Sequence, residues 1–135
     1  MTNSEAHITW REMVKRTQDE VGERNIAQWL CEHASGCDAD EFGDILGDLV
    51  SERSAQHLHS MLARYAKGEP LQYVMGRWAF RRLDLLVDSR VLIPRPETEL
   101  LVEHVTRYAL QKIRDVGRGV AIADLGTGSG AVGRA

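Results

Sequence analysis

The sequence predicts an α+α/β fold, in which a helical bundle is followed by a β-hairpin linker and the start of an α/β domain. Up to about residue 67, apolar side chains recur every three or four positions, which is the period of a helix. Residues 71–93 change to partial alternation with aromatic side chains, which favours strands. An apolar run at residues 120–123 then leads into a glycine-rich turn. We therefore expect domains at residues 1–68, 69–95 and 96–135.

Four helices are predicted in the first domain. They span residues 5–21, 25–34, 39–49 and 51 to about 67. Gly22 and Gly36 are expected to end the first two helices, because glycine readily adopts the left-handed conformation that follows a helix. The third helix is weaker, since Gly43 and Gly47 each lower helix stability by about 1 kcal/mol. Ser51 is a suitable N-cap for the fourth helix.

The second and third predicted domains meet at a proline-flanked arginine. Residues 69–73 are expected to stop the fourth helix and start a strand. Pro94, Arg95 and Pro96 should form a rigid extended segment, because each proline fixes its own φ and restrains the residue before it. A helix is then expected from Pro96 or Thr98 to about Ile113.

Composition and charge exclude several classes of protein. The 135 residues are 43% hydrophobic and 27% charged, which is ordinary for a globular chain, and the net charge of -3 gives no basic surplus for a nucleic-acid partner. No apolar run reaches the roughly 18–20 residues of a membrane span, and the polar N-terminus lacks a signal-peptide core. The protein is expected to be a cytoplasmic monomer. Cys31 and Cys37 should remain thiols, and with His33 they lack the fourth ligand and spacing of a metal site.

The turn after residues 120–123 has the features of a ligand-binding loop. Alternating glycines permit positive φ and let a ligand approach the backbone, and the helix that follows offers unpaired N–H groups. Asp124 can hold the turn or meet a positively charged ligand group, and two hydroxyls lie nearby. The candidate cofactor-binding residues here are Asp124, Gly126, Thr127, Gly128, Ser129 and Gly130.

The glycines alone leave the cofactor open. Gly128, Gly130 and Gly133 match the G-x-G-x-x-G fingerprint of dinucleotide-binding enzymes. The acidic residue that would confirm a nicotinamide enzyme lies roughly 20 residues further on, beyond residue 135. A nicotinamide enzyme, an S-adenosylmethionine enzyme and a tight turn without a ligand therefore all remain possible at this point.

Three segments together resemble one family. They are Glu-Pro-Leu-Gln-Tyr-Val-Met-Gly at residues 69–76, Val-Leu-Ile-Pro-Arg-Pro-Glu-Thr-Glu at residues 91–99, and Asp-Leu-Gly-Thr-Gly-Ser-Gly at residues 124–130. In this order and spacing the chain resembles the N5-glutamine methyltransferases of peptide chain release factors, the HemK/PrmC family. The resemblance implies a helical domain that recognises the protein substrate and a class I, Rossmann-like methyltransferase domain. It also implies S-adenosylmethionine as donor and the glutamine of the Gly-Gly-Gln motif as acceptor.

The resemblance assigns a second group of site residues. It implies that Gly126 to Gly130 hold the methionine end and ribose of the donor, and that Arg95, Pro96 and Thr98 lie beside the cofactor. The residues alone favour simpler roles, with Arg95 as an ion-pair partner of Glu97 or Glu99 and Thr98 as a helix N-cap. The three tryptophans are expected in the core or at domain contacts; they are Trp10, Trp29 and Trp78.

No catalytic residue is assigned. In the family, an Asn-Pro-Pro-Tyr motif grips the acceptor amide, and no such motif occurs in residues 1–135. We therefore expect this chain to be truncated and inactive alone. Two alternatives are a helical module that binds a release factor without chemistry and a fragment of a nicotinamide-dependent oxidoreductase.

Overall fold

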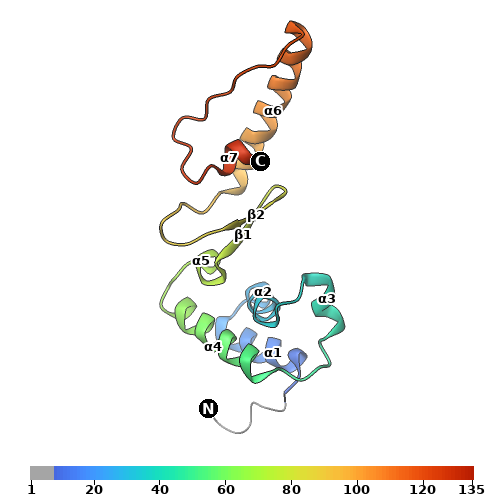
Figure 1. Ribbon diagram of the computed structural model, residues 1–135. Helices are drawn as coiled ribbons and strands as arrows, with labels where there is room; N and C mark the ends of the chain where they lie inside the picture. The colour runs from blue at the N-terminus through green and yellow to red at the C-terminus, as the bar shows by residue number, and fades with distance from the viewer. Residues whose placement is uncertain (1–7) are drawn as a thin grey trace. The chain divides into compact units, whose positions relative to one another are not determined.

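The computed structural model describes residues 8–135. The chain divides into two compact units, Met1–Met75 and Gly76–Ala135. We call them the helical unit and the second unit. Figure 1 shows helices alone in the former and a hairpin followed by helices in the latter. The described chain is thus mostly helical, with one small antiparallel hairpin. The finer division that makes residues 69–95 a separate linker stays a prediction.

Five helices form the helical unit. They are α1 (Trp10–Val21), α2 (Arg24–Ser35), α3 (Ala39–Asp44), α4 (Glu52–Ala66) and α5 (Leu71–Met75). Two predicted stops and a cap are confirmed. Gly22 and Gly36 are left-handed, with φ of 81° and 77°, at the ends of α1 and α2. The Ser51 hydroxyl accepts a hydrogen bond from the backbone N–H of Ser54 at 3.1 Å, which caps α4.

The core of the helical unit is continuous. Trp10 packs edge-on against Phe42, with ring centroids 5.5 Å apart, which joins α1 to α3. The buried Cys31 thiol donates to the Thr17 hydroxyl across 3.6 Å, which joins α2 to α1. The buried members of this core are Ile8, Trp10, Met13, Leu30, Cys31, Ala34, Phe42, Val50, Ala55, Leu58, Met61, Leu62, Leu71 and Val74.

Three sequence-based predictions fail in this unit. The third helix ends at Asp44 instead of residue 49, because residues 45–50 turn back and pair with the start of α1. The predicted strand after Pro70 is the helix α5, whose i, i+3 pair Leu71 and Val74 is buried. Trp29 is 42% exposed and lies outside the core, so of its two expected places only a domain contact stays a prediction. The first helix starts at Trp10 with Thr9 as its N-cap, so residues 8 and 9 of the expected helix are not helical. Residues 5–7 lie outside the described residues.

The second unit starts with the predicted hairpin. Strands β1 (Arg77–Phe80) and β2 (Leu83–Leu86) are antiparallel, and Phe80 pairs with Leu83 across a two-residue turn. Arg81 in this turn has a φ of 53°, which suits the twist of a tight hairpin. Helices α6 (Pro96–Val116) and α7 (Ala131–Arg134) follow, and α6 runs three residues further than predicted, to its cap at Gly117.

The strand predicted at residues 120–123 is not formed. This segment is irregular and exposed, because no strand among residues 8–135 lies beside it to accept its hydrogen bonds. The buried core of the second unit is small and consists of Phe80, Val102 and Ala131. Many apolar side chains remain exposed on α6 and after it: Leu100, Leu101, Tyr108, Leu110, Ile113, Val116, Val120, Ile122 and Leu125. The described residues therefore do not contain the layered sheet of an α/β domain.

Candidate functional site

The glycine-rich turn is an exposed loop that ends at a short helix. Gly126, Gly128 and Gly130 all have positive φ, at 75°, 56° and 79°. The backbone N–H of Gly130 donates to the carbonyl oxygen of Thr127 at 2.9 Å, which closes the last part of the turn. Gly130 is then the N-cap of α7. This loop has the backbone conformation for which glycine is needed.

Conformation rather than crowding requires these glycines. A Cβ added at Gly126 or Gly128 would meet no atom within 4 Å, but L side chains are strained at these φ values. At Gly130, an added Cβ would lie 4.0 Å from the Thr127 hydroxyl. At Gly133, it would lie 3.8 Å from Oδ2 of Asp124, so this carboxylate faces the first turn of α7. Space around the loop is open to a ligand.

Thr127 and Ser129 present two polar side chains to solvent. Both residues are exposed, and neither hydroxyl makes a hydrogen bond within residues 8–135. Asp124 is exposed as well. The loop therefore offers two hydroxyls and one carboxylate that are not used to hold the fold.

The proline-flanked arginine lies at the start of α6. Pro96 is the first residue of the helix, which confirms one of the two predicted starts, and Arg95 is its N-cap. Thr98 lies inside the helix, and its N–H donates to the Arg95 carbonyl at 3.0 Å, so the interpretation of Thr98 as the N-cap is wrong. Arg95 is exposed and forms no ion pair with any described residue, including Glu97 and Glu99.

Glu99 instead fixes the hairpin on the start of α6. Its carboxylate accepts a hydrogen bond from the backbone N–H of Arg81 at 2.9 Å, and its carbonyl accepts from the Arg81 guanidinium at 3.2 Å. These two bonds hold the hairpin turn against the first turns of α6. Glu99 is thereby engaged by Arg81 and not by Arg95.

The small core of the second unit brings the two predicted parts of the site toward each other. Ala131 directly follows the glycine loop and packs with Val102 of α6 and Phe80 of the hairpin. Val102 is one turn beyond Thr98 in α6. Figure 1 shows α7 beside the start of α6, in agreement with this packing. The end of the glycine loop and the start of α6 are therefore held by the same small hydrophobic core.

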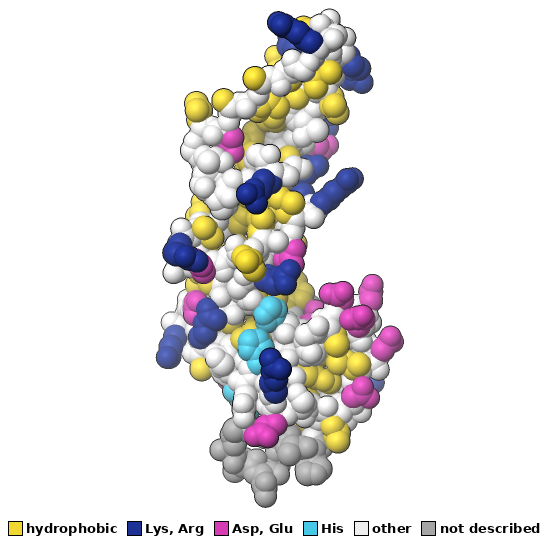
Figure 2. Space-filling model, in the orientation of Figure 1, with side chains coloured by type: hydrophobic (Ala, Val, Ile, Leu, Met, Phe, Trp, Pro, Cys, Tyr) yellow, Lys and Arg dark blue, Asp and Glu magenta, His cyan; other side chains and the backbone are white. Residues whose placement is uncertain are grey.

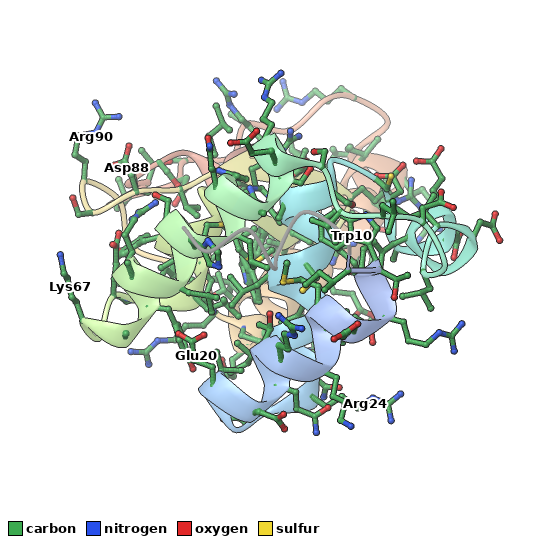
Figure 3. All side chains as sticks on the ribbon, turned by 90° about the horizontal axis from the view of Figure 1, so that it is seen from below. Trp10, Glu20, Arg24, Lys67, Asp88 and Arg90 are labelled. Atoms are coloured by element: carbon green, nitrogen blue, oxygen red, sulfur yellow. The ribbon has the colours of Figure 1, made fainter. Side chains whose placement is uncertain are left out.

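A second charged pair lies just before this region and is largely exposed. Asp88 and Arg90 project from the loop after β2 (Figure 3), and the Arg90 guanidinium donates to Oδ2 of Asp88 at 2.6 Å. These bonds lower the pKa of Asp88 to about 2. Because the pair is in solvent it contributes little to stability, and we assign it no chemistry.

Two cavities lie away from every predicted site residue. One, of about 240 Å³, is formed by Val105, Tyr108, Ala109 and Lys112 of α6 and by residues 120–122. The other, of about 270 Å³, lies in the helical unit between α1, α2 and α3. Sequence reasoning missed the second one, although Arg11 and Lys15 are four residues apart on α1 and therefore share a face.

The cysteines and histidines give no metal centre in residues 8–135: no group of three or more His, Cys, Asp or Glu side chains there is arranged to hold a metal ion. Both cysteines are free thiols. Burial raises the pKa of Cys31 to about 11, partly offset by its hydrogen bond to Thr17, so this thiol stays protonated and unreactive at neutral pH. No helix within the described range is long and apolar enough to cross a bilayer.

Comparison with known proteins gives a consistent result. Residues 5–76 match the family described as "PrmC N-terminal domain", which is more than half of the chain. The chain therefore belongs to the PrmC N-terminal domain family, as its sequence motifs predict. The match ends one residue beyond the boundary between the two structural units.

Curated relatives extend the similarity past this domain. A protein of Pasteurella multocida named "Release factor glutamine methyltransferase" is 45% identical over 86 residues, which cover 62% of this chain and 29% of the relative. Proteins of the same name from Haemophilus influenzae and Xylella fastidiosa are 38% and 40% identical, over 76% and 82% of this chain. These matches cover 35% and 38% of those two relatives. The chain thus spans about a third of the length of the relatives it matches.

Proposed function

We propose that this chain carries the substrate-docking and donor-binding parts of an S-adenosylmethionine-dependent enzyme that methylates a peptide chain release factor. The acceptor is the side-chain amide of the glutamine in the Gly-Gly-Gln motif. The names of the relatives support the reaction, and the matched N-terminal domain supports the assignment of docking to the helical unit. Residues 96–135 are then the first part of a class I methyltransferase domain.

The glycine loop is the observation that carries this proposal. Its three positive-φ glycines keep the backbone open to a ligand, and the hydroxyls of Thr127 and Ser129 have no partner among residues 8–135. S-adenosylmethionine has an ammonium group, a carboxylate and ribose hydroxyls, so a loop with hydroxyls, N–H groups and a carboxylate fits its polar parts. Asp124 suits the ammonium or the ribose. We assign the loop from Gly126 to Gly130 to the methionine end and the adjoining ribose.

The start of α6 supplies the complementary charge. Arg95 is exposed and unpaired within the described part of the chain, and a guanidinium suits a carboxylate such as that of the donor. Pro96 fixes the first turn of the helix, and Thr98 offers a hydroxyl in the same turn. Glu99 is held by Arg81, so it does not neutralise Arg95.

The chemistry requires positioning more than acid–base help. An amide nitrogen is a poor nucleophile because its lone pair is delocalised into the carbonyl group. S-adenosylmethionine supplies an electrophilic methyl group when bound. The residues of this chain would hold the donor and dock the protein that carries the amide, which brings the reacting groups together. Residues 1–135 contain no Asn-Pro-Pro-Tyr motif to grip the amide, and we propose that this chain alone docks its substrate without methylating it.

Calorimetric titration of the 135-residue chain with S-adenosylmethionine and with NAD⁺ tests the donor assignment. We expect S-adenosylmethionine to bind more tightly than NAD⁺. The variants Arg95→Ala and Gly128→Val should each weaken it by about tenfold, through a lost charge-assisted contact and a blocked, strained loop. Gly119→Ala, in a loop position without positive φ, is the matched control. Tighter binding of NAD⁺ would support the oxidoreductase alternative instead.

A second assay tests the division between docking and transfer. The chain is incubated with a release factor and S-adenosylmethionine labelled in its methyl group. We expect complex formation without incorporation of label, as the release-factor-binding module predicts. Because the helical unit has a continuous core of its own, it is expected to fold and to bind the release factor without methyl transfer. Methyl transfer at an ordinary rate would contradict the proposed inactivity of the isolated chain.

A further inference from the structure

The cavity of the helical unit lies among three helices, and both apolar and polar side chains line it. Val14 of α1, together with Phe42 and Leu46, supplies the apolar surface, and Phe42 itself is anchored in the core. The volume of about 270 Å³ is close to the lower limit of roughly 300 Å³ for small-molecule pockets. It is therefore suited to one or two inserted side chains rather than to a whole cofactor.

The walls of this cavity are fixed by backbone hydrogen bonds. The N–H of Arg11 donates to the Leu46 carbonyl at 2.9 Å, and the N–H of Trp10 donates to the Asp48 carbonyl at 3.1 Å. These bonds tie the segment after α3 to the first turn of α1. Because the cavity is preformed, binding a partner in it costs little conformational entropy of the protein, which favours docking there.

One rim is cationic. Arg11 and Lys15 lie one turn apart on α1, and Arg24 is the first residue of α2. Arg24 extends outward from the start of α2 (Figure 3). None of these three side chains forms an ion pair with a residue in the range 8–135. They are available to an anionic partner.

The opposite side carries acidic residues. Acidic side chains gather around α3, at the lower right of Figure 2. The acidic residues of this segment are Asp38, Asp40, Glu41, Asp44 and Asp48. Beside them, α3 lines the cavity only with Ala39, Phe42 and Gly43. A continuous phosphate backbone would be repelled on this side, which disfavours a nucleic acid and favours a short segment with localised charge.

We infer that this cavity docks a segment of the release factor in which an apolar side chain is flanked by carboxylates. The apolar side chain enters between Val14 and Phe42, and the carboxylates meet Lys15 and Arg24. This inference rests on the proposed function, because it takes the release factor as the partner. It adds where on the helical unit the partner binds and what chemistry recognises it.

Charge reversal tests the cationic rim. The Kd of the 135-residue chain for purified release factor is measured for wild type, for Lys15→Glu/Arg24→Glu and for Arg53→Glu/Lys67→Glu. The two double variants change the net charge equally, and the second pair lies on α4 and at its end, away from the cavity. We expect the first variant to bind at least about tenfold more weakly and the second within about twofold of wild type.

Two glycine variants that add bulk without a change in charge test the cavity itself. Gly43 lines the cavity and Gly47 does not, and a Cβ at either position meets no atom within 4 Å. Gly43→Met places a side chain across the opening and also favours helix α3, so loss of folding is not expected. It should weaken binding by about tenfold, whereas Gly47→Met should leave the Kd unchanged.

The outcomes separate this inference from the proposed function. If wild type binds the release factor and Lys15→Glu/Arg24→Glu and Gly43→Met bind equally well, the inference is wrong and the docking role survives. If wild type does not bind the release factor, or binds an RNA oligonucleotide through this rim instead, both are wrong. Circular dichroism of every variant confirms that the helical unit is folded in each comparison.

Discussion

The helical unit and the second unit differ in how much of their apolar surface they bury. The helical unit covers its apolar stripes with its own helices, and Leu30, Cys31 and Leu58 are completely inaccessible to solvent. In the second unit, α6 buries Val102 but leaves Leu100, Leu101 and other apolar residues exposed. One region is complete by itself, whereas the other presents a surface that nothing in the described residues covers.

This difference shows that a helix can form from local sequence signals, whereas a parallel strand depends on distant parts of the chain. Helices bond internally and need only a partner for one stripe, which neighbouring helices supply. A parallel strand needs strands on both sides and helices on both faces. The apolar run at residues 120–123 has neither, so it stays irregular even though its side chains favour a strand.

The largest effect is expected from truncating the core of the helical unit. Leu30→Ala should lower its free energy of unfolding by about 3 kcal/mol, because it leaves a cavity in a fully buried position. Leu110→Ala on α6, where the side chain is 54% exposed, should change stability by less than about 0.5 kcal/mol. Urea denaturation followed by circular dichroism measures both. Equal losses would mean that the two units are equally well packed.

The next effect is a loss of stability at alkaline pH. Burial raises the pKa of Cys31 from 9.0 to about 11, so above pH 9 the unfolded state ionises first and is favoured. Unfolding free energy should fall by roughly 2–3 kcal/mol as pH rises from about 9 to about 11. Cys31→Ala should lack this part of the decline, while Cys37→Ser keeps it. Identical pH profiles for both variants would exclude a buried, protonated Cys31.

A smaller effect is expected at the end of the helical unit. Arg64 of α4 donates to the carbonyls of Tyr73 and Val74 at 2.8 and 3.1 Å, and these carbonyls lie in the last turn of the short helix α5. Its ion pair with Glu69 is exposed and contributes little. Arg64→Met should therefore lower stability by about 1 kcal/mol, mainly through the two lost carbonyl bonds. Amide hydrogen exchange should show faster exchange in α5 but not in α2.

The pairing of Arg64 with Glu69 also predicts how the stability of the helical unit changes at acid pH. Its hydrogen bonds lower the pKa of Glu69 below the ordinary 4.5, so the carboxylate form is favoured in the folded state. The stabilisation is present above pH 4.5 and is lost as pH falls through the lowered pKa. Glu69→Gln should flatten this part of the acid profile. An unchanged profile would show that the pair does not contribute in solution.

The smallest effect is expected in the glycine loop. Gly128→Ala places a side chain at a φ of 56°, which introduces strain of about 1 kcal/mol or less in an exposed loop. Gly119→Ala should be neutral, since that residue has no positive φ and a Cβ there meets nothing within 4 Å. Thermal unfolding of the second unit distinguishes them. A larger effect at Gly119 would contradict the assigned loop conformation.

The sequence predicts the helical unit well because its signals are local. Caps and stops at Gly22, Gly36 and Ser51 are confirmed, as is the start of α6 at Pro96. The predicted strand at residues 71–75 is a helix instead, because Pro70 begins a turn and Arg64 completes its far end, a contact across ten residues. Such tertiary contacts leave no periodic signal in the segment itself.

The candidate site is predictable in its residues but not in its geometry. The positive φ values of the loop follow from its glycines, and the shared anchor at Ala131 and Val102 becomes visible only in the fold. The cationic cavity of the helical unit was missed, because Arg11, Lys15 and Arg24 converge only once α1 and α2 pack together. Their roles toward a donor or a partner stay predictions.

Native-state hydrogen exchange of the full 135-residue chain tests the central contrast most directly. The account predicts that amides of α1, α2 and α4 exchange together and slowly, as one cooperative unit, while those of α6 and the glycine loop exchange much faster. Protection of α6 and the loop equal to that of α2 would contradict it. The second unit would then be as complete as the helical one.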